Sequence, residues 1–164
     1  MGNITDLDIT GLISQKSGAP LGDAHELFSR AILMRLGFEV GKVDLSSSPF
    51  DIYTTCFITP GGQKTTLRTQ VRTADNSVSF VIGGRGGKDR ISIPGVKTHK
   101  LSTSDCDLIL AIQKKTLDIY VIPTEFINRW GNTKALSKII LLKNNWDILL
   151  NWNPQYLSNL SVRL

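Results

Sequence analysis

The order of the expected elements along this 164-residue chain indicates one α/β (α+β) domain built on a mixed sheet. An amphipathic helix comes first, and three strand-like segments joined by turn sequences follow it. Beyond a glycine-rich basic segment come two almost wholly apolar runs, which are typical of strands buried on both faces. Helical patterns close the chain, so we expect helices to flank the sheet.

The first helix is expected over residues 23–37. Asp23 is a favoured N-cap, and Glu26 three residues later completes a capping box. Gly37 suits the left-handed position that follows a helix. His25 is expected on the surface. The apolar face is predicted from residues at helical spacing: Leu27, Ala31, Ile32, Leu33, Met34 and Leu36.

Alternation and β-branched residues predict strands over Phe50–Thr59, Lys64–Ala74 and Ser77–Ile82. The two apolar runs, Asp107–Ile112 and Leu117–Ile122, are expected to form buried strands. The remaining expectations are an extended piece at Phe38–Val40, a helix over Glu125–Trp130, a strand over Ile139–Leu142 and a helix over Asn144–Leu150.

Basic residues are concentrated in one segment of the chain. The formal net charge is +5, and residues 64–100 alone hold eight basic and two acidic residues. Within this segment, residues 83–100 form a loop rich in glycine, lysine and arginine. A local basic face predicts a polyanion as partner, and a solvated basic surface is the alternative. The candidate contacts to a polyanion such as DNA are Arg68, Arg85, Lys88, Arg90, Lys97 and Lys100.

Composition disfavours several classes of protein. No apolar run reaches the roughly 18 residues that a membrane span needs, so no membrane partner is expected. The first ten residues carry Asp6 and Asp8 and no apolar block, which disfavours a signal peptide. Cys56 and Cys106 lie 50 residues apart and form neither a disulfide framework nor a zinc-ligand pattern. The cytoplasm is therefore the expected compartment.

Oxygen ligands and a cation converge on two of the predicted strands. Asp51 begins one strand, and Gln70 and Arg72 are two apart on the next, so both project from the same face. A hairpin between these strands brings the side chains together. Mg²⁺ prefers oxygen ligands, which Asp51, the Gln70 amide and the Val71 backbone carbonyl can supply. Arg72 would then stand where charge develops on a phosphate.

These residues fall in an ordered set of motifs: Gly22-Asp23-Ala24-His25-Glu26, then Ser47-Ser48-Pro49-Phe50-Asp51-Ile52, then Thr69-Gln70-Val71-Arg72-Thr73-Ala74. Asp107-Leu108-Ile109 and Tyr120-Val121-Ile122-Pro123 follow. The set resembles the PD-(D/E)XK nuclease superfamily, and within it the Gln-x-Lys branch that includes cyanobacterial group I intron homing endonucleases. The resemblance spans roughly residues 20 to 130.

The resemblance implies a restriction-endonuclease-like mixed sheet flanked by helices. It also implies Mg²⁺-dependent cleavage of double-stranded DNA by a homing or restriction enzyme. Glu26, Asp51, Gln70 and Arg72 take the catalytic positions. A domain this small reaches both strands most simply as a homo-oligomer, a dimer or a tetramer. Lys64 or a loop lysine is a candidate to replace the family's lysine, which is Arg72 here.

Other interpretations of the same residues stay open. Glu26 can serve only as a capping residue, and Asp51 only as a turn residue. Gln70 and Arg72 can be plain exposed strand residues. Because arginine stays protonated, Arg72 cannot act as a general base, so a catalytically weak or inactive DNA-binding module on a nuclease core is the first alternative function. A junction resolvase of the same fold is the second.

Overall fold

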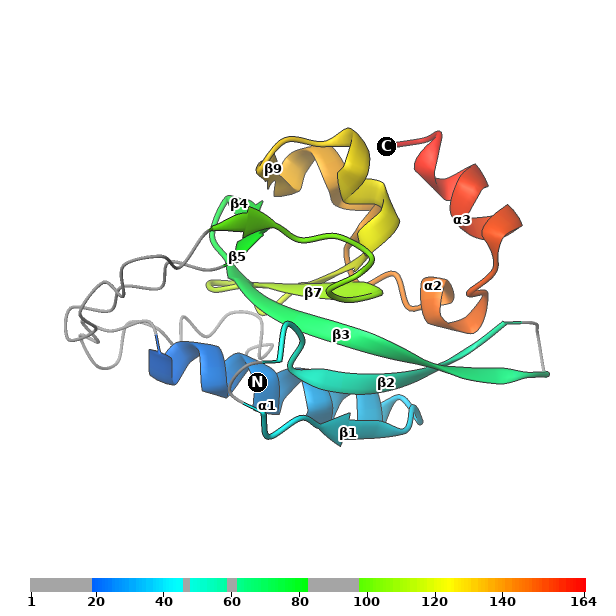
Figure 1. The fold of residues 1–164 in the computed structure, drawn as a ribbon, viewed down its shortest axis with the longest axis horizontal. Coiled ribbons are helices and arrows are strands. Elements are labelled where there is room, and N and C mark those ends of the chain that lie inside the picture. The colour runs from blue at the N-terminus through cyan, green and yellow to red at the C-terminus, as the bar shows by residue number, and fades with distance from the viewer. Residues whose placement is uncertain (1–18, 46–47, 59–61, 83–97) are drawn as a thin grey trace, which may run out of the picture.

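The computed structural model describes residues 19–45, 48–58, 62–82 and 98–164. Its centre is a five-stranded sheet in the order β1-β2-β3-β7-β8 (Figure 1). The strands are β1 (Val40–Lys42), β2 (Ile52–Phe57), β3 (Lys64–Ala74), β7 (Leu108–Gln113) and β8 (Ile119–Pro123).

Neighbouring strands of this sheet are antiparallel, except that β3 and β7 run parallel. The sheet is therefore mixed, as the sequence predicts, and with its flanking helices it has a restriction-endonuclease-like fold. Among the helices that the structure describes, none is long and apolar enough to cross a membrane.

Helix α1 (Ala19–Arg35) begins four residues before the predicted start. Asp23 therefore lies inside the helix and is not the N-cap that the sequence predicted. The predicted end is confirmed. Gly37 has φ +93°, and the Phe38 amide donates to the Leu33 carbonyl at 3.0 Å, which is the Schellman arrangement.

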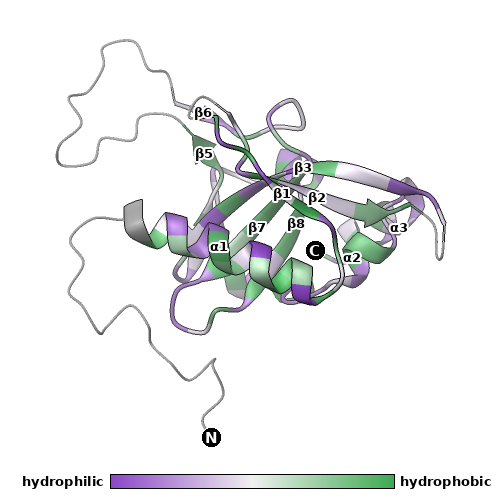
Figure 2. Ribbon diagram, turned by 90° about the horizontal axis from the view of Figure 1, so that it is seen from below, coloured by the Kyte–Doolittle hydropathy of each residue, from purple (hydrophilic) through white to green (hydrophobic). Residues whose placement is uncertain are grey.

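The predicted apolar face of α1 is only partly right. Leu33 is fully buried, but Leu27 is 62% and Met34 is 59% exposed. The buried positions also include His25, which was expected on the surface, and Ser29. Figure 2 shows α1 lying over one face of the sheet. A hydrogen bond between His25 and Thr73 of β3 helps to hold the helix there. The spacing of apolar residues does not predict this contact.

Strand β2 alternates between buried and accessible side chains. Ile52, Thr54 and Cys56 are buried, whereas Tyr53 is exposed and Phe57 is half-buried. The pairing with β3 sets Tyr53 opposite Arg68 and Thr55 opposite Thr66, and these side chains share the accessible face. This alternation is the period-two pattern of a sheet covered on one side only.

The predicted strand Ser77–Ile82 is wrong as one element of the main sheet. It divides into β4 (Ser77–Ser79) and β5 (Val81–Ile82), which pair with β9 (Thr133–Ala135) and β6 (His99–Lys100). The buried Phe80 lies between the two pieces. Its amide donates to the Asn132 carbonyl, and its carbonyl accepts from the Leu101 amide, so the chain changes partner there.

The C-terminal part is helical. It contains η2 (Thr124–Arg129), η3 (Leu136–Leu142), α2 (Asp147–Leu150) and α3 (Pro154–Ser161), where η marks 3₁₀ geometry. The predicted strand Ile139–Leu142 is therefore wrong, and a short apolar run does not distinguish a strand from a buried helical turn.

Helix α3 was missed, although its start follows a known rule. Pro154 occupies the first turn, and the Asn153 side chain accepts from the Tyr156 amide at 2.9 Å. Proline at the first helical position after an Asn N-cap is a common helix start.

Candidate active site at the start of β2

Asp51 occupies a fixed position directly before β2. Its amide donates to the Thr69 carbonyl on β3, and its carbonyl accepts from the Val43 amide just after β1, both at 3.0 Å. The backbone on either side therefore holds the half-buried Asp51 residue between two neighbouring strands.

The Asp51 carboxylate meets the motif of β3 directly. Oδ2 accepts from the Val71 amide at 2.7 Å and from Nε2 of Gln70 through a short hydrogen bond. Nε2 also donates to the Val71 carbonyl at 3.1 Å. Gln70 is only 4% exposed. The three predicted ligand residues thus lie together.

This donor set fits a hard cation that keeps much of its water shell. It combines one carboxylate, one carboxamide and one backbone carbonyl, all of which can bind a metal ion through oxygen. The Gln70 amide now turns its nitrogen toward Asp51. To offer its oxygen instead, the amide must turn over and give up both of its hydrogen bonds. Among the described residues, no three His, Cys, Asp or Glu side chains cluster as a metal site.

Arg72 is half-buried and follows Gln70 on the same face of β3. Its positive charge reaches Cys106, just before β7. Burial raises the pKa of the Cys106 thiol to about 11, and the Arg72 guanidinium is among the smaller influences that lower this pKa. A thiol in this state is not a nucleophile at neutral pH, so Cys106 is a core residue.

Glu26 lies on α1 toward the end of the sheet where Asp51 stands. Its charge helps to raise the pKa of Lys42, for which the hydrogen bond and charge of Asp44 are the larger causes. Lys42 pairs with Ile52, the residue after Asp51. Glu26 is half-buried. The charge of Glu26 thus acts on a residue of β1, and its place in the active site stays a prediction.

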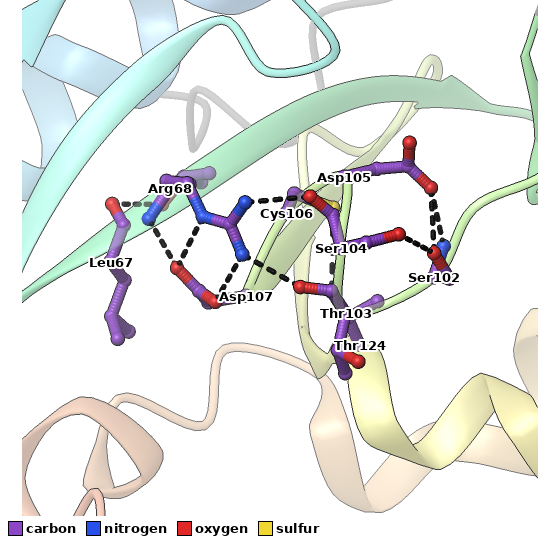
Figure 3. Close-up of polar contacts among 10 residues, drawn as sticks. Leu67, Arg68, Ser102, Thr103, Ser104, Asp105, Cys106, Asp107 and Thr124 are labelled. Carbon is purple, nitrogen blue, oxygen red and sulfur yellow. Dashed lines mark hydrogen bonds and ion pairs between the residues drawn. The ribbon is translucent and has the colours of Figure 1, made fainter.

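Arg68 is held in a network at the start of β7 (Figure 3). Nε donates to Asp107 at 3.1 Å and Nη2 at 2.9 Å, and the guanidinium also donates to the carbonyls of Thr103 and Ser104. The Arg68 amide donates to the same carboxylate at 2.9 Å. This geometry anchors β3 to the turn before β7, and a DNA contact by Arg68 stays a prediction.

The turn itself is closed by Asp105. Its carboxylate accepts from the Ser102 amide at 2.9 Å and lies 3.2 Å from the His99 ring. Although burial opposes the ionised form, these contacts lower the pKa of Asp105. The ionised carboxylate ties β6 to the turn that supports Arg68.

The other predicted DNA contacts divide into two groups. Lys100 donates to the Ile127 and Trp130 carbonyls at 2.6 and 2.5 Å, so it caps the end of η2. Four residues lie outside the described residues: Arg85, Lys88, Arg90 and Lys97.

Lys64 does not replace the expected lysine. It binds Glu39 at 2.8 Å and stands eight residues before Arg72, about 26 Å along an extended strand.

The sequence analysis missed a hydrogen bond between His25 on α1 and Thr73 on β3, beside the candidate site. His25 Nδ1 lies 2.8 Å from Thr73 Oγ1, next to Arg72, while His25 itself is next to Glu26. Burial, and then the charge of Lys114, lowers the pKa of His25. A signal was present, because His25 and Ser29 are four residues apart and share one helix face.

Comparisons with known proteins support the fold. No family model and no curated protein matches the chain. A bacterial homing endonuclease, I-Ssp6803I, is similar in structure with a TM-score of 0.61 at 16% sequence identity. The similarity covers 87% of this chain and 97% of that one. The chain therefore has a fold resembling that of a homing endonuclease.

Proposed function

We propose that this protein is a metal-dependent endonuclease that hydrolyses phosphodiester bonds in double-stranded DNA. The observation that carries the proposal is the meeting of Asp51 with Gln70 and the Val71 backbone at adjoining strands, next to the fixed charge of Arg72. The structural similarity to I-Ssp6803I supports it.

Asp51, Gln70 and the Val71 carbonyl would hold Mg²⁺. When bound, such an ion polarises a phosphoryl oxygen and activates water at neutral pH. The single Asp51 carboxylate gives the site modest affinity for the metal. Its hydrogen bond from the Val71 amide fixes one carboxylate oxygen in place.

Arg72 serves as a permanent cation beside the reacting phosphate. A guanidinium matches phosphate oxygens with two parallel donors and stabilises the negative charge that develops on them. Because it stays protonated, water deprotonation falls to another group. Glu26 on α1 is the second carboxylate of the proposed site. It would bind a second metal ion or contact the ligands of the first.

The basic segment supplies attraction to the DNA backbone. Residues 64–100 carry a net charge of +6, whereas the rest of the chain sums to −1. Neutralising phosphates releases counterions, which drives binding without regard to sequence. Two copies of the chain would place one site on each strand of the duplex.

One observation favours a second candidate function, a DNA-binding module without catalysis. Arg72 stands where the Gln-x-Lys pattern has lysine, and it cannot take a proton from water. The fold and the basic segment would then bind DNA without cutting it.

Incubation of the purified chain with supercoiled plasmid, linear duplex and a four-way junction, with Mg²⁺ or with EDTA, tests these functions. We expect nicked or linear plasmid in Mg²⁺ and uncut plasmid in EDTA. Cleavage restricted to the junction would identify a resolvase. Binding in a gel-shift assay without cleavage in any metal would support the inactive module, and neither binding nor cleavage would contradict the proposed function.

A further inference from the structure

The accessible face of β2 and β3 continues the candidate site along the sheet. Six side chains form this open face: Tyr53, Thr55 and Phe57 on β2, with Lys64, Thr66 and Arg68 opposite them on β3. Asp51 directly precedes this row on β2, and Gln70 directly continues it on β3. The opposite face of the same strands is closed, because Ile52 and Cys56 are fully buried and Leu67 is 4% exposed.

The open face is polar and its hydroxyl groups are available. Among the described residues, the hydroxyls of Thr55 and Thr66 make no hydrogen bond. Tyr53 is 43% exposed, and its ring rests edge-on against Phe50 at 5.0 Å between centroids. Gly41 pairs with Tyr53 on the edge strand, so no side chain stands beside the ring there.

The charges of this face are already matched. Lys64 binds Glu39 at 2.8 Å, and Arg68 binds Asp107 at 2.9 Å. Attraction of phosphate to the open face is therefore weak, and its chemistry suits hydrogen bonding to uncharged groups. Threonine hydroxyls both donate and accept, and threonine methyl groups pack on the thymine methyl in the major groove.

The dimensions fit a DNA groove. From Arg72 to Lys64 the strand extends about 26 Å, which equals about eight base-pair steps of roughly 3.4 Å. Over Thr55–Phe57 and its partners Lys64–Thr66, neither β1 nor β7 flanks β2 and β3. This part is a ribbon of two strands about 5 Å apart, which the major groove, about 12 Å wide, admits. A phosphate placed at Asp51 and Arg72 brings the adjoining groove to the ribbon.

We infer that the open face enters the major groove of the substrate duplex beside the cleaved phosphate, where Thr55 and Thr66 read base edges. The inference rests on the proposed endonuclease function and adds a specificity surface to it. Base readout near the cut falls to the β2–β3 ribbon, and phosphate binding falls to basic residues outside it.

Selection from a random duplex library tests this assignment, with Ca²⁺ replacing Mg²⁺ to suppress cleavage. The wild type, Thr55→Val, Thr66→Val and the control Thr133→Val are compared. Thr133 is exposed on β9, in another sheet. Valine keeps the shape and strand preference of threonine, and thermal melting checks the fold. We expect each ribbon variant to lose about five- to tenfold preference at one or two base pairs, with unchanged affinity for random duplex.

A photocrosslinking residue, p-benzoylphenylalanine, at Tyr53 provides a second measurement, with the same residue at Lys138 on η3 as control. We expect crosslinks to duplex from position 53 only. Three results would each overturn the inference: identical motifs for all variants, no motif for the wild type, or no crosslink from position 53. If the wild type still cleaved plasmid with Mg²⁺, the proposed endonuclease function would stand. A wild type that neither binds nor cuts duplex would remove both.

Discussion

At residue 72 the chain carries arginine where the Gln-x-Lys pattern has lysine, and this difference determines how the site can work. A guanidinium offers several fixed donors to a phosphate, whereas an ammonium offers a compact charge that can lose its proton when buried. Arg72 is half-buried on β3, beside Gln70 and near Cys106. The role that we propose for Arg72 is therefore charge stabilisation.

Substitutions of Arg72 distinguish a role in charge stabilisation from a role in proton transfer. We expect Arg72→Lys to keep or raise the rate of Mg²⁺-dependent plasmid cleavage, and Arg72→Ala to lower it at least ~10²-fold, because a cation at developing charge is lost. Single-turnover cleavage rates measure both. Equal rates for the three proteins would show that Arg72 takes no part.

Gln70 offers a second residue-scale prediction. Gln70→Glu places a carboxylate against the Asp51 carboxylate, so like charges repel unless a cation lies between them. We expect the variant to melt at a lower temperature than wild type in EDTA and to gain more thermal stability from Mg²⁺. Gln155→Glu, exposed on α3, is the matched control. Equal Mg²⁺ stabilisation of all three proteins would remove Gln70 from the metal site.

At the scale of elements, α1 and β3 are joined by the buried contact between His25 and Thr73. The folded state favours the neutral ring, because burial, helped by the charge of Lys114, lowers the pKa of His25 from its ordinary 6.5. Below about pH 6.5 the unfolded chain therefore binds more protons than the folded one, and stability falls as the pH falls.

Thermal melting between pH 7.5 and 5 tests this contact. We expect the wild type to lose stability across that range and His25→Gln to lose less, although it is less stable at pH 7.5. A parallel decline of wild type and His25→Gln would show that His25 does not link α1 to β3 in this way.

Local patterns specified most of the central sheet. The strict alternation of Lys64–Ala74 and the apolar runs before and after residue 115 correspond to β3, β7 and β8. The sequence alone predicts that Asp51 and Gln70 meet, because a hairpin places residues of two neighbouring strands directly opposite each other. The meeting of these two residues needs no information from distant parts of the chain.

Elements that depend on tertiary partners could not be predicted. The segment Ser77–Ile82 leaves the main sheet because Phe80 is buried between two separate ladders. Burial of His25 follows from where α1 docks, and the Arg68 network needs Asp107 from 39 residues away. Such contacts join distant segments, so a local pattern does not identify the partner residues.

At the scale of the whole molecule, the uneven charge predicts salt-dependent DNA binding. Lys88 and Lys97 lie in the basic segment, outside the described residues. We expect Lys88→Ala or Lys97→Ala to weaken binding to all duplexes and to reduce the log–log salt slope by about one unit each. We expect Arg85→Ala or Arg90→Ala to reduce discrimination between sequences instead. Unchanged affinity and slope in all four variants would place the phosphate contacts elsewhere.

The site at Asp51 is tested most directly by one comparison, Mg²⁺-dependent plasmid cleavage by the wild type, Asp51→Asn and Asp147→Asn. Asp147 is exposed on α2 and serves as the matched control. We expect Asp51→Asn to bind DNA as the wild type does and to cut it at least ~10²-fold more slowly, because the carboxylate of the metal site is lost. Asp147→Asn should cut at the wild-type rate. Cleavage by Asp51→Asn at the wild-type rate would contradict the assignment of the active site.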